Sequence, residues 1–326
     1  MVGLLGSSDE LLRLIERSFS CDIHVRGNEI TLAGEPAEVA LAARLFEELI
    51  TLLERREVLT PDAIQRSIAM LREQTDERPA DVLSMNIISS RGRTIRPKTL
   101  NQKRYVDAID DHTIVFGIGP AGTGKTYLAM AKAVQALQAK QVNRIILTRP
   151  AVEAGERLGF LPGTLNEKID PYLRPLYDAL HDMVDPESIP RLTASGVIEV
   201  APLAYMRGRT LNDSFIVLDE AQNTSAEQMK MFLTRLGFGS RMVVTGDVTQ
   251  VDLPAGTRSG LRMVQGILEG IEDVRFCRLT SKDVVRHRLV SDIVDAYARH
   301  DAEVAAESGQ SGRGASGPRR SSRSSR

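Results

Sequence analysis

The chain has 326 residues, with 42 Lys and Arg against 43 Asp and Glu and a formal net charge of −1. This balance excludes a protein that is basic as a whole, so any contact with nucleic acid must come from local patches. The two cysteines, Cys21 and Cys277, lie far apart without metal-ligand spacing, which favours a reducing compartment over a disulfide. Neither a secretory signal nor a membrane-spanning apolar run is visible, and we expect a cytoplasmic protein.

Residues 1–78 are predicted to form a small α+β domain. Apolar residues recur at helical spacing over 9–19, a hairpin with alternating side chains follows over 21–34, and Pro36 begins a second amphipathic helix. This helix–hairpin–helix order resembles part of a KH-like RNA-binding module, although no clear G-x-x-G loop is present. The alternative is a small domain that contacts other proteins.

Thr60 and Pro61 predict the start of a further helix, which ends near residue 75. Residues 79–98 are polar and largely without periodicity, and we interpret them as a linker. The linker carries a basic patch that is either a solvated surface or a contact for phosphates or RNA. Its members are Arg91, Arg93, Arg96 and Lys98.

Residues 99–305 are predicted to form the second domain, in which apolar strands alternate with helices. This alternation predicts an α/β fold with a parallel, doubly wound sheet. A helical region over 164–184 is expected to break at Pro171 and Pro175. Residues 306–326 are rich in Ser, Gly and Arg and predict a disordered basic tail, either an electrostatic arm for RNA or a partner, or a solubilising end. The candidate strands are 113–118, 143–148, 197–201, 215–219, 241–246 and 274–279.

A phosphate-binding loop of the form G-x-x-x-x-G-K-[ST] follows the first of these strands. Its glycines allow backbone N–H groups to surround an anion at the start of the Ala- and Leu-rich helix that follows. Lys125 is expected to reach the β- and γ-phosphates, and the Thr126 hydroxyl to bind Mg²⁺. The loop comprises Gly119, Pro120, Ala121, Gly122, Thr123, Gly124, Lys125 and Thr126.

Two carboxylates follow the apolar strand 215–218, at the edge of the sheet where the nucleotide is expected. Asp219 suits the metal side, together with Thr126. Glu220 suits the base that orients or deprotonates the attacking water. A phosphate loop alone indicates nucleotide binding, whereas a second strand that ends in this pair indicates hydrolysis.

The strand 241–246 is followed by Asp247 and Gln250. An amide at Gln250 can donate to a γ-phosphate oxygen and accept from water. Asp247 suits water or the metal shell, and both residues are placed to report on the γ-phosphate.

Upstream of the loop, Gln102 is a candidate for base selection, because an amide can pair with N6 and N7 of adenine. Tyr105 either stacks on the base or packs in the core. No intact [NT]KxD guanine motif occurs, since Thr280-Ser281-Lys282-Asp283 has its Lys one position too late. These features favour ATP over GTP.

As a set, these motifs resemble the PhoH-like ATPases over residues 8–300. The resemblance rests on the phosphate loop, L-D-E-A-Q-N, V-T-G-D-V-T-Q and N-Q-K-R-Y-V-D-A-I, and on the segments 148–163, 204–211 and 283–287. That family is related to superfamily 1 helicase cores, which implies a P-loop NTPase fold, ATP hydrolysis with Mg²⁺ and a role in RNA handling. It also implies that Lys125 and Thr126 bind phosphate and metal, Asp219 and Glu220 act on Mg²⁺ and water, and Gln250 senses the γ-phosphate.

An arginine usually completes such a site, because charge that develops on the transferred phosphoryl group needs a counter-cation. Arg286 resembles the late helicase arginine and is the first candidate; a surface salt bridge is the alternative for each candidate. The further candidates are Arg207 and Arg209, then Arg149 and Arg258. Glu153 and Glu156 suit a channel or a solvated loop, and His287 suits packing.

The second domain has room for one nucleotide-binding core. We therefore predict a homo-oligomeric ring, a hexamer by preference, with ATP at subunit boundaries. Two functions remain open: an ATP-driven enzyme that remodels RNA, alongside an endoribonuclease as the family resemblance implies, or a regulatory ATPase that switches a protein partner. A metabolite kinase is disfavoured, because Glu220 and Gln250 suit an attacking water.

Overall fold

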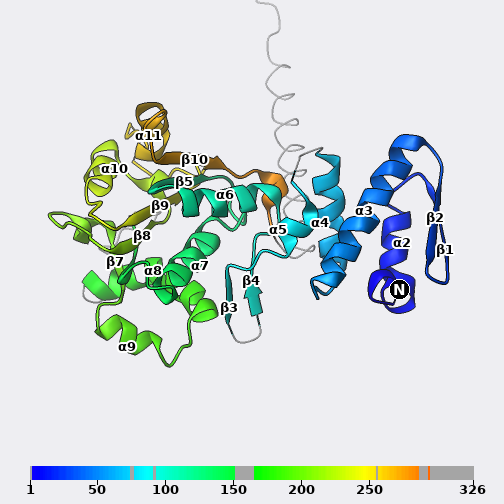
Figure 1. Ribbon diagram of the computed structural model, residues 1–326. Helices are drawn as coiled ribbons and strands as arrows, with labels where there is room; N and C mark the ends of the chain where they lie inside the picture. The colour runs from blue at the N-terminus through cyan, green and yellow to red at the C-terminus, as the bar shows by residue number, and fades with distance from the viewer. Residues whose placement is uncertain are drawn as a thin grey trace, which may run out of the picture. The chain divides into compact units, whose positions relative to one another are not determined.

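The computed structural model contains one six-stranded parallel sheet and two antiparallel hairpins among its described residues (Figure 1). The residues up to Val284 that it describes form one compact unit. Within the described part of the chain, no helix is both long enough and apolar enough to cross a bilayer. The described residues are 2–73, 77–90, 93–150, 165–254, 256–285 and 293.

The N-terminal part of the chain contains the first hairpin, one strand of which packs against α3. The β1–β2 pair is antiparallel, and Val25 lies opposite Ile30. Thr60 caps α4, since its hydroxyl accepts a hydrogen bond from the Ala63 amide at 3.2 Å. The elements are α1 (Val2–Leu5), η1 (Ser7–Asp9), α2 (Glu10–Glu16), β1 (Asp22–Arg26), β2 (Glu29–Ala33), α3 (Pro36–Glu54) and α4 (Pro61–Arg72).

The segment 79–98 is more structured than its lack of periodicity predicts. It contains α5 (Pro79–Leu83), β3 (Ile88–Ser90) and β4 (Arg93–Ile95), which are too short to give a periodic signal. Val82 and Leu83 are buried in the same core as α3 and α4. The boundaries of the proposed domains stay a prediction.

The six predicted strands all occur, within one residue of their expected limits. Their order in the sheet is β10-β5-β9-β8-β6-β7, and every neighbouring pair is parallel. The predicted α/β P-loop NTPase fold class is therefore confirmed. The strands are β5 (Ile114–Ile118), β6 (Arg144–Arg149), β7 (Ile198–Pro202), β8 (Ser214–Leu218), β9 (Arg241–Gly246) and β10 (Val274–Arg278).

Helices cover both faces of this sheet (Figure 1). Alternate strand residues such as Val217 and Val243 pack with α6, α7 and α8, while Ile216 and Val244 pack with α10 and α11. The helical elements of this part are α6 (Leu100–Asp111), α7 (Lys125–Gln138), α8 (Leu165–Met183), α9 (Ile189–Ala194), η3 (Leu203–Met206), η4 (Ala221–Asn223), α10 (Ala226–Leu233), α11 (Gly260–Leu268) and η5 (Ser281–Asp283).

The expected breaks at Pro171 and Pro175 are wrong, because α8 continues through both prolines. Each proline removes one backbone donor. Burial offsets this loss, since Leu176 and Leu180 are 1% and 0% exposed in the core.

Candidate functional site

The phosphate-binding loop leaves β5 and enters α7. Gly124 precedes the helix with φ of 79°, a left-handed conformation that favours glycine. Gly119 lies against another part of the backbone, since a Cβ atom there would stand 2.4 Å from the Leu279 carbonyl oxygen. The loop glycines are therefore required by conformation at one position and by close packing at another.

Lys125 begins α7, and its ammonium curls back into the loop. Nζ donates to the carbonyl oxygens of Gly119 at 2.7 Å and Pro120 at 2.9 Å. Burial lowers the pKa of the Lys125 ammonium, while the Asp247 and Asp219 carboxylates oppose that shift. The ammonium is thus held at the centre of the loop, where a bound phosphate would meet it.

The structure brings together the two residues that the sequence assigns to the metal. The Thr126 hydroxyl, in the first turn of α7, donates to Oδ1 of Asp219, the residue after β8, at 2.6 Å. Thr245, the residue before the end of β9, donates to the same Asp219 oxygen at 2.8 Å. A hydroxyl and a carboxylate therefore converge directly beneath the loop.

A second buried carboxylate, that of Asp247, follows strand β9 and uses only one of its oxygens in hydrogen bonds among the described residues. It is 5% exposed, and its Oδ1 accepts from the Thr249 amide at 2.9 Å and from the Thr249 hydroxyl at 2.6 Å. Its Oδ2 is buried without a hydrogen-bond partner among the described residues, an arrangement that usually indicates a missing ion, water or ligand.

These oxygens fit Mg²⁺, which binds through one or two carboxylates and completes its shell with water and substrate phosphates. A dedicated all-protein cage is not what this metal requires. The described residues contain no cluster of three or more His, Cys, Asp or Glu side chains suited to a metal. Asp219 and Thr126 are the residues that would hold the ion, with Asp247 close to them.

Glu220 follows Asp219 in a strained turn. Its φ of 53° and ψ of 39° are left-handed, which is uncommon for a residue other than glycine. Arg149, at the end of the neighbouring strand β6, places Nη2 3.2 Å from Glu220 Oε1. Gln222 Nε2 donates to the other carboxylate oxygen, Oε2. Both oxygens of the candidate base are therefore held by fixed donors.

Gln222 is a site residue that the sequence analysis missed. It is 1% exposed, and besides contacting Glu220 it accepts a hydrogen bond from the Asp247 amide through Oε1 at 3.0 Å. Its amide thus connects the end of β8 to the end of β9. Its position was the available signal, because an amide two residues after a carboxylate at the end of a strand can hydrogen-bond that carboxylate.

Gln250 itself has an exposed side chain, and its backbone amide donates to the Asp247 carbonyl at 3.1 Å. The structure therefore places it in the loop after β9, beside Asp247. Its contact with a γ-phosphate stays a prediction.

The two residues proposed to recognise the base have internal partners. Gln102 Nε2 donates to the Thr123 carbonyl at 3.0 Å, and its Oε1 accepts from the Lys98 amide at 2.7 Å. Pairing with adenine would require these bonds to be exchanged. Tyr105 is fully buried and donates to the Lys125 carbonyl at 3.2 Å, so stacking on a base is wrong and core packing is correct.

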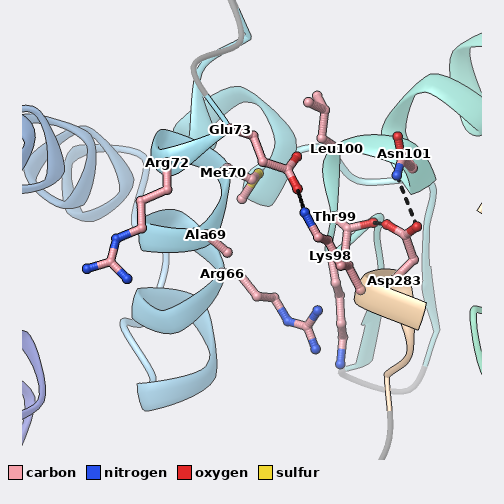
Figure 2. A pocket seen from close by; sticks show the side chains of 11 residues that line it. Arg66, Ala69, Met70, Arg72, Glu73, Lys98, Thr99, Leu100, Asn101 and Asp283 are labelled. Carbon is pink, nitrogen blue, oxygen red and sulfur yellow. Dashed lines mark hydrogen bonds and ion pairs between the residues drawn. The ribbon is translucent and has the colours of Figure 1, made fainter. Parts of the chain in front are cut away.

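A pocket of about 520 Å³ opens between α4 and the start of α6, and Asn101, which precedes Gln102 in the chain, lines it (Figure 2). Figure 2 shows Arg66 and Lys98 extending into it from different walls, and Thr99 and Asn101 bonded to Asp283 on one side. Because its lining includes Lys98 and Asn101, the one bonded to Gln102 through its amide and the other next to it in the chain, this pocket is a candidate for the part of a nucleotide beyond its phosphates.

The candidate arginines differ in their contacts and in their exposure to solvent. Arg149 contacts Glu220, whereas Arg209 makes a two-pronged ion pair with Glu199 at 2.6 and 2.7 Å. Arg207 and Arg258 are exposed. Five other predicted residues lie outside the described part of the chain, as does the predicted tail over 306–326; they are Arg91, Glu153, Glu156, Arg286 and His287.

Comparison with known proteins identifies the family of this chain. A family model described as PhoH-like protein matches residues 94–298. A PhoH-like protein of Mycobacterium tuberculosis (strain H37Rv) is 74% identical over 301 residues, which cover 92% of this chain and 86% of that protein. A PhoH-like protein of Bacillus subtilis is 49% identical over 301 residues, covering 92% of this chain and 94% of its own.

Among solved structures, the Sulfolobus solfataricus SWI2/SNF2 ATPase core in complex with dsDNA is 15% identical. The match covers 55% of this chain and 43% of that chain with a TM-score of 0.32, which is too low to carry an argument. The sequence relatives and the family model are decisive by themselves: this chain belongs to the PhoH-like protein family.

Proposed function

We propose that this chain hydrolyses ATP to ADP and phosphate. The observation that carries the proposal is the contact of Thr126 with Asp219 beneath the phosphate loop, with Glu220 as the next residue. A loop that binds phosphates, a pair of oxygens that suits a divalent cation and a carboxylate beside them are the parts that phosphoryl transfer to water requires.

Each residue then has a distinct task. The Lys125 ammonium neutralises charge on the β- and γ-phosphates, and backbone N–H groups of the loop hold their oxygens. Mg²⁺, bound by Thr126 and Asp219, would supply further positive charge to the phosphate oxygens. Glu220 orients the attacking water and accepts its proton. Gln250 responds to the γ-phosphate, which makes the state of the site depend on the nucleotide.

We further propose that hydrolysis is coupled to RNA binding or remodelling in the cytoplasm. The exposed Lys98 beside the pocket of Figure 2 supports a contact with phosphates, as does the arginine-rich sequence of residues 306–326. A single nucleotide-binding core favours work as a ring, with an arginine such as Arg286 supplied by a neighbouring copy. An endoribonuclease is the partner that the family resemblance suggests. The competing function is a regulatory ATPase that switches a protein partner without unwinding RNA.

Phosphate release with and without single-stranded RNA separates these functions. Clear stimulation by RNA that disappears in Lys125→Ala supports remodelling, and indifference to RNA across salt concentrations supports the regulator. For hydrolysis itself, Glu220→Gln should bind ATP and lower kcat by at least about a hundredfold. A near-normal kcat in that variant removes Glu220 from its role.

The ring has its own test. Light scattering of the purified protein with ATP should report a closed oligomer. A monomer that hydrolyses ATP at the full rate would refute the shared site.

A further inference from the structure

Arg149 occupies a position that the hydrolytic mechanism does not use. It ends β6, whose Thr148 lies opposite Leu218 of β8, and so it emerges next to the turn that carries Glu220. Its side chain is 21% exposed and that of Glu220 is 35% exposed, so neither partner of the ion pair is freely solvated. The pair therefore lies within the edge of the sheet where chemistry is expected, and differs from an ordinary surface salt bridge.

The guanidinium spans two acceptors. Its Nη2 lies 3.2 Å from Glu220 Oε1, and its Nη1 donates to the Tyr172 carbonyl of α8 at 3.1 Å. A planar fork of this kind fixes the relative position of both acceptors, which a lysine ammonium on a flexible stem does less well. Arg149 thus joins the candidate base to a helix that contributes no other predicted site residue.

Helix α8 is unusual at the point of this contact. Tyr172 lies between Pro171 and Pro175, neither of which can donate a backbone hydrogen bond within the helix. The adjoining residues Leu173 and Leu176 are 6% and 1% exposed, so the helix is anchored in the core on one face. Pro175 leaves the Pro171 carbonyl without its i+4 donor, so Arg149 contacts the helix one residue after that carbonyl.

Glu220 needs external support because of its backbone. A left-handed conformation outside glycine costs of the order of 1–3 kcal/mol and persists only when the surroundings enforce it. Here the enforcing groups are Gln222 on Oε2 and Arg149 on Oε1. Displacing a catalytic group by about 1 Å is sufficient to lower a rate about a hundredfold.

We propose that Arg149 is a positioning residue that holds the Glu220 carboxylate for the attack of water. Because Arg149 also contacts α8, a shift of that helix moves the Glu220 carboxylate. The inference rests on the proposed ATP hydrolysis. It differs from the role of an arginine that neutralises the transferred phosphoryl group, because Arg149 acts through Glu220. Binding events that shift α8 then change the turnover rate without changing the affinity for ATP.

A double-mutant cycle tests this role. Phosphate release is measured for the full chain, Arg149→Ala, Glu220→Gln and the double variant, each with circular dichroism and binding of a fluorescent ATP analogue. We expect Arg149→Ala to lower kcat at least about tenfold and to change KM less than about twofold. In the Glu220→Gln background the same substitution should change kcat less than about twofold, because its target is already lost.

Arg144→Ala is the matched control. Arg144 lies on the same strand at the opposite end, where its Nε donates to the Ser214 hydroxyl at 2.8 Å. This variant should keep the kcat of the unmodified chain. Arg149→Lys retains the positive charge but lacks the planar guanidinium that reaches two acceptors at once. We therefore expect a kcat between those of the full chain and Arg149→Ala.

The possible results distinguish a failure of the role proposed for Arg149 from a failure of the proposed ATP hydrolysis. Losses that multiply in the double variant would place Arg149 on the phosphate and overturn the proposal. An unchanged or increased kcat in Arg149→Ala would also overturn it. If that variant fails to fold or to bind the analogue, Arg149→Lys decides: a full kcat refutes the proposal, and a lowered kcat that vanishes in the Glu220→Gln background supports it. Absence of hydrolysis in the unmodified chain, with ATP bound, would instead refute the proposed function.

Discussion

Asp283 allows a stability prediction that is independent of any catalytic role. Its carboxylate is 2% exposed and accepts hydrogen bonds from the Thr99 hydroxyl at 2.6 Å and the Asn101 amide at 3.0 Å. The backbone amide and the hydroxyl of Thr280 also donate to it, at 2.7 and 3.1 Å. Through these bonds η5 is fastened to the start of α6, next to the residue that touches the phosphate loop.

The magnitude of Asp283→Ala follows from these donors. Thr280 is exposed, so water replaces the carboxylate for its two donors at little cost. The bonds from Thr99 and Asn101 to a charged acceptor contribute about 1.5–3 kcal/mol each. The desolvation of the carboxylate, which the variant no longer incurs, offsets part of that sum. We therefore expect a loss of about 2–4 kcal/mol in the free energy of unfolding.

Urea unfolding of the full chain provides the measurement, with Asp62→Ala as the control. Asp62 is a carboxylate whose side chain is 56% exposed in an ion pair with Arg66, and its removal should cost less than about 1 kcal/mol. Asp283→Asn keeps the volume and one acceptor oxygen, and should fall between the two. A loss in Asp283→Ala no greater than that in Asp62→Ala would refute the reasoning.

Three further predictions concern packing and titration. In Gly246→Ala the new methyl would lie 2.8 Å from Gln222 Oε1 and 2.5 Å from a Leu261 methyl carbon. We expect a loss of about 1–3 kcal/mol in urea unfolding with a lower kcat, and an unchanged kcat would contradict the role of Gln222. The hydrogen bond from Arg209 lowers the pKa of Glu199 below its ordinary 4.5, so the pair stabilises the fold above that pH and stops doing so as the pH falls through the lowered value. The stability difference between the unmodified chain and Arg209→Met should accordingly be constant at neutral pH and shrink in acid, and a difference that grows in acid would disprove the assignment. Burial raises the pKa of the Cys277 thiol to about 11, so its modification by a disulfide reagent should be slow at pH 8 and accelerate up to about pH 11, and fast labelling at pH 8 would contradict this environment.

The sheet and the phosphate loop were predictable because their signals are local. Runs such as 241–246 are apolar and β-branched over the length of one strand. The loop motif lies within eight consecutive residues, and its glycines and lysine predict the phosphate-binding conformation directly. The meeting of Thr126 with Asp219 also followed, since the carboxyl ends of parallel strands share one edge of a sheet.

Features that depend on distant partners were not predictable in this way. The amide of Gln102 turns to the Thr123 carbonyl, and Gln222 turns to the Asp247 amide, because the tertiary fold brings unsatisfied backbone groups beside them. The helix through Pro171 is a similar case, where burial outweighs a local rule. The link between Arg149 and Glu220 required knowledge of which strand lies next to β8.

The strand order also determines when the site can form during folding. Strand β5 carries the loop, but both of its neighbours, β9 and β10, follow much later in the chain. The contacts of Thr126 with Asp219 and Thr245 span 93 and 119 residues, and closing such long segments slows folding.

On the ribosome, β5 therefore emerges long before either partner strand, as an apolar segment with two open edges. Such a segment needs protection by a chaperone or by rapid collapse onto α7. A translation product that stops before Arg241 has the complete phosphate-loop motif but lacks both strands that flank β5 in the sheet.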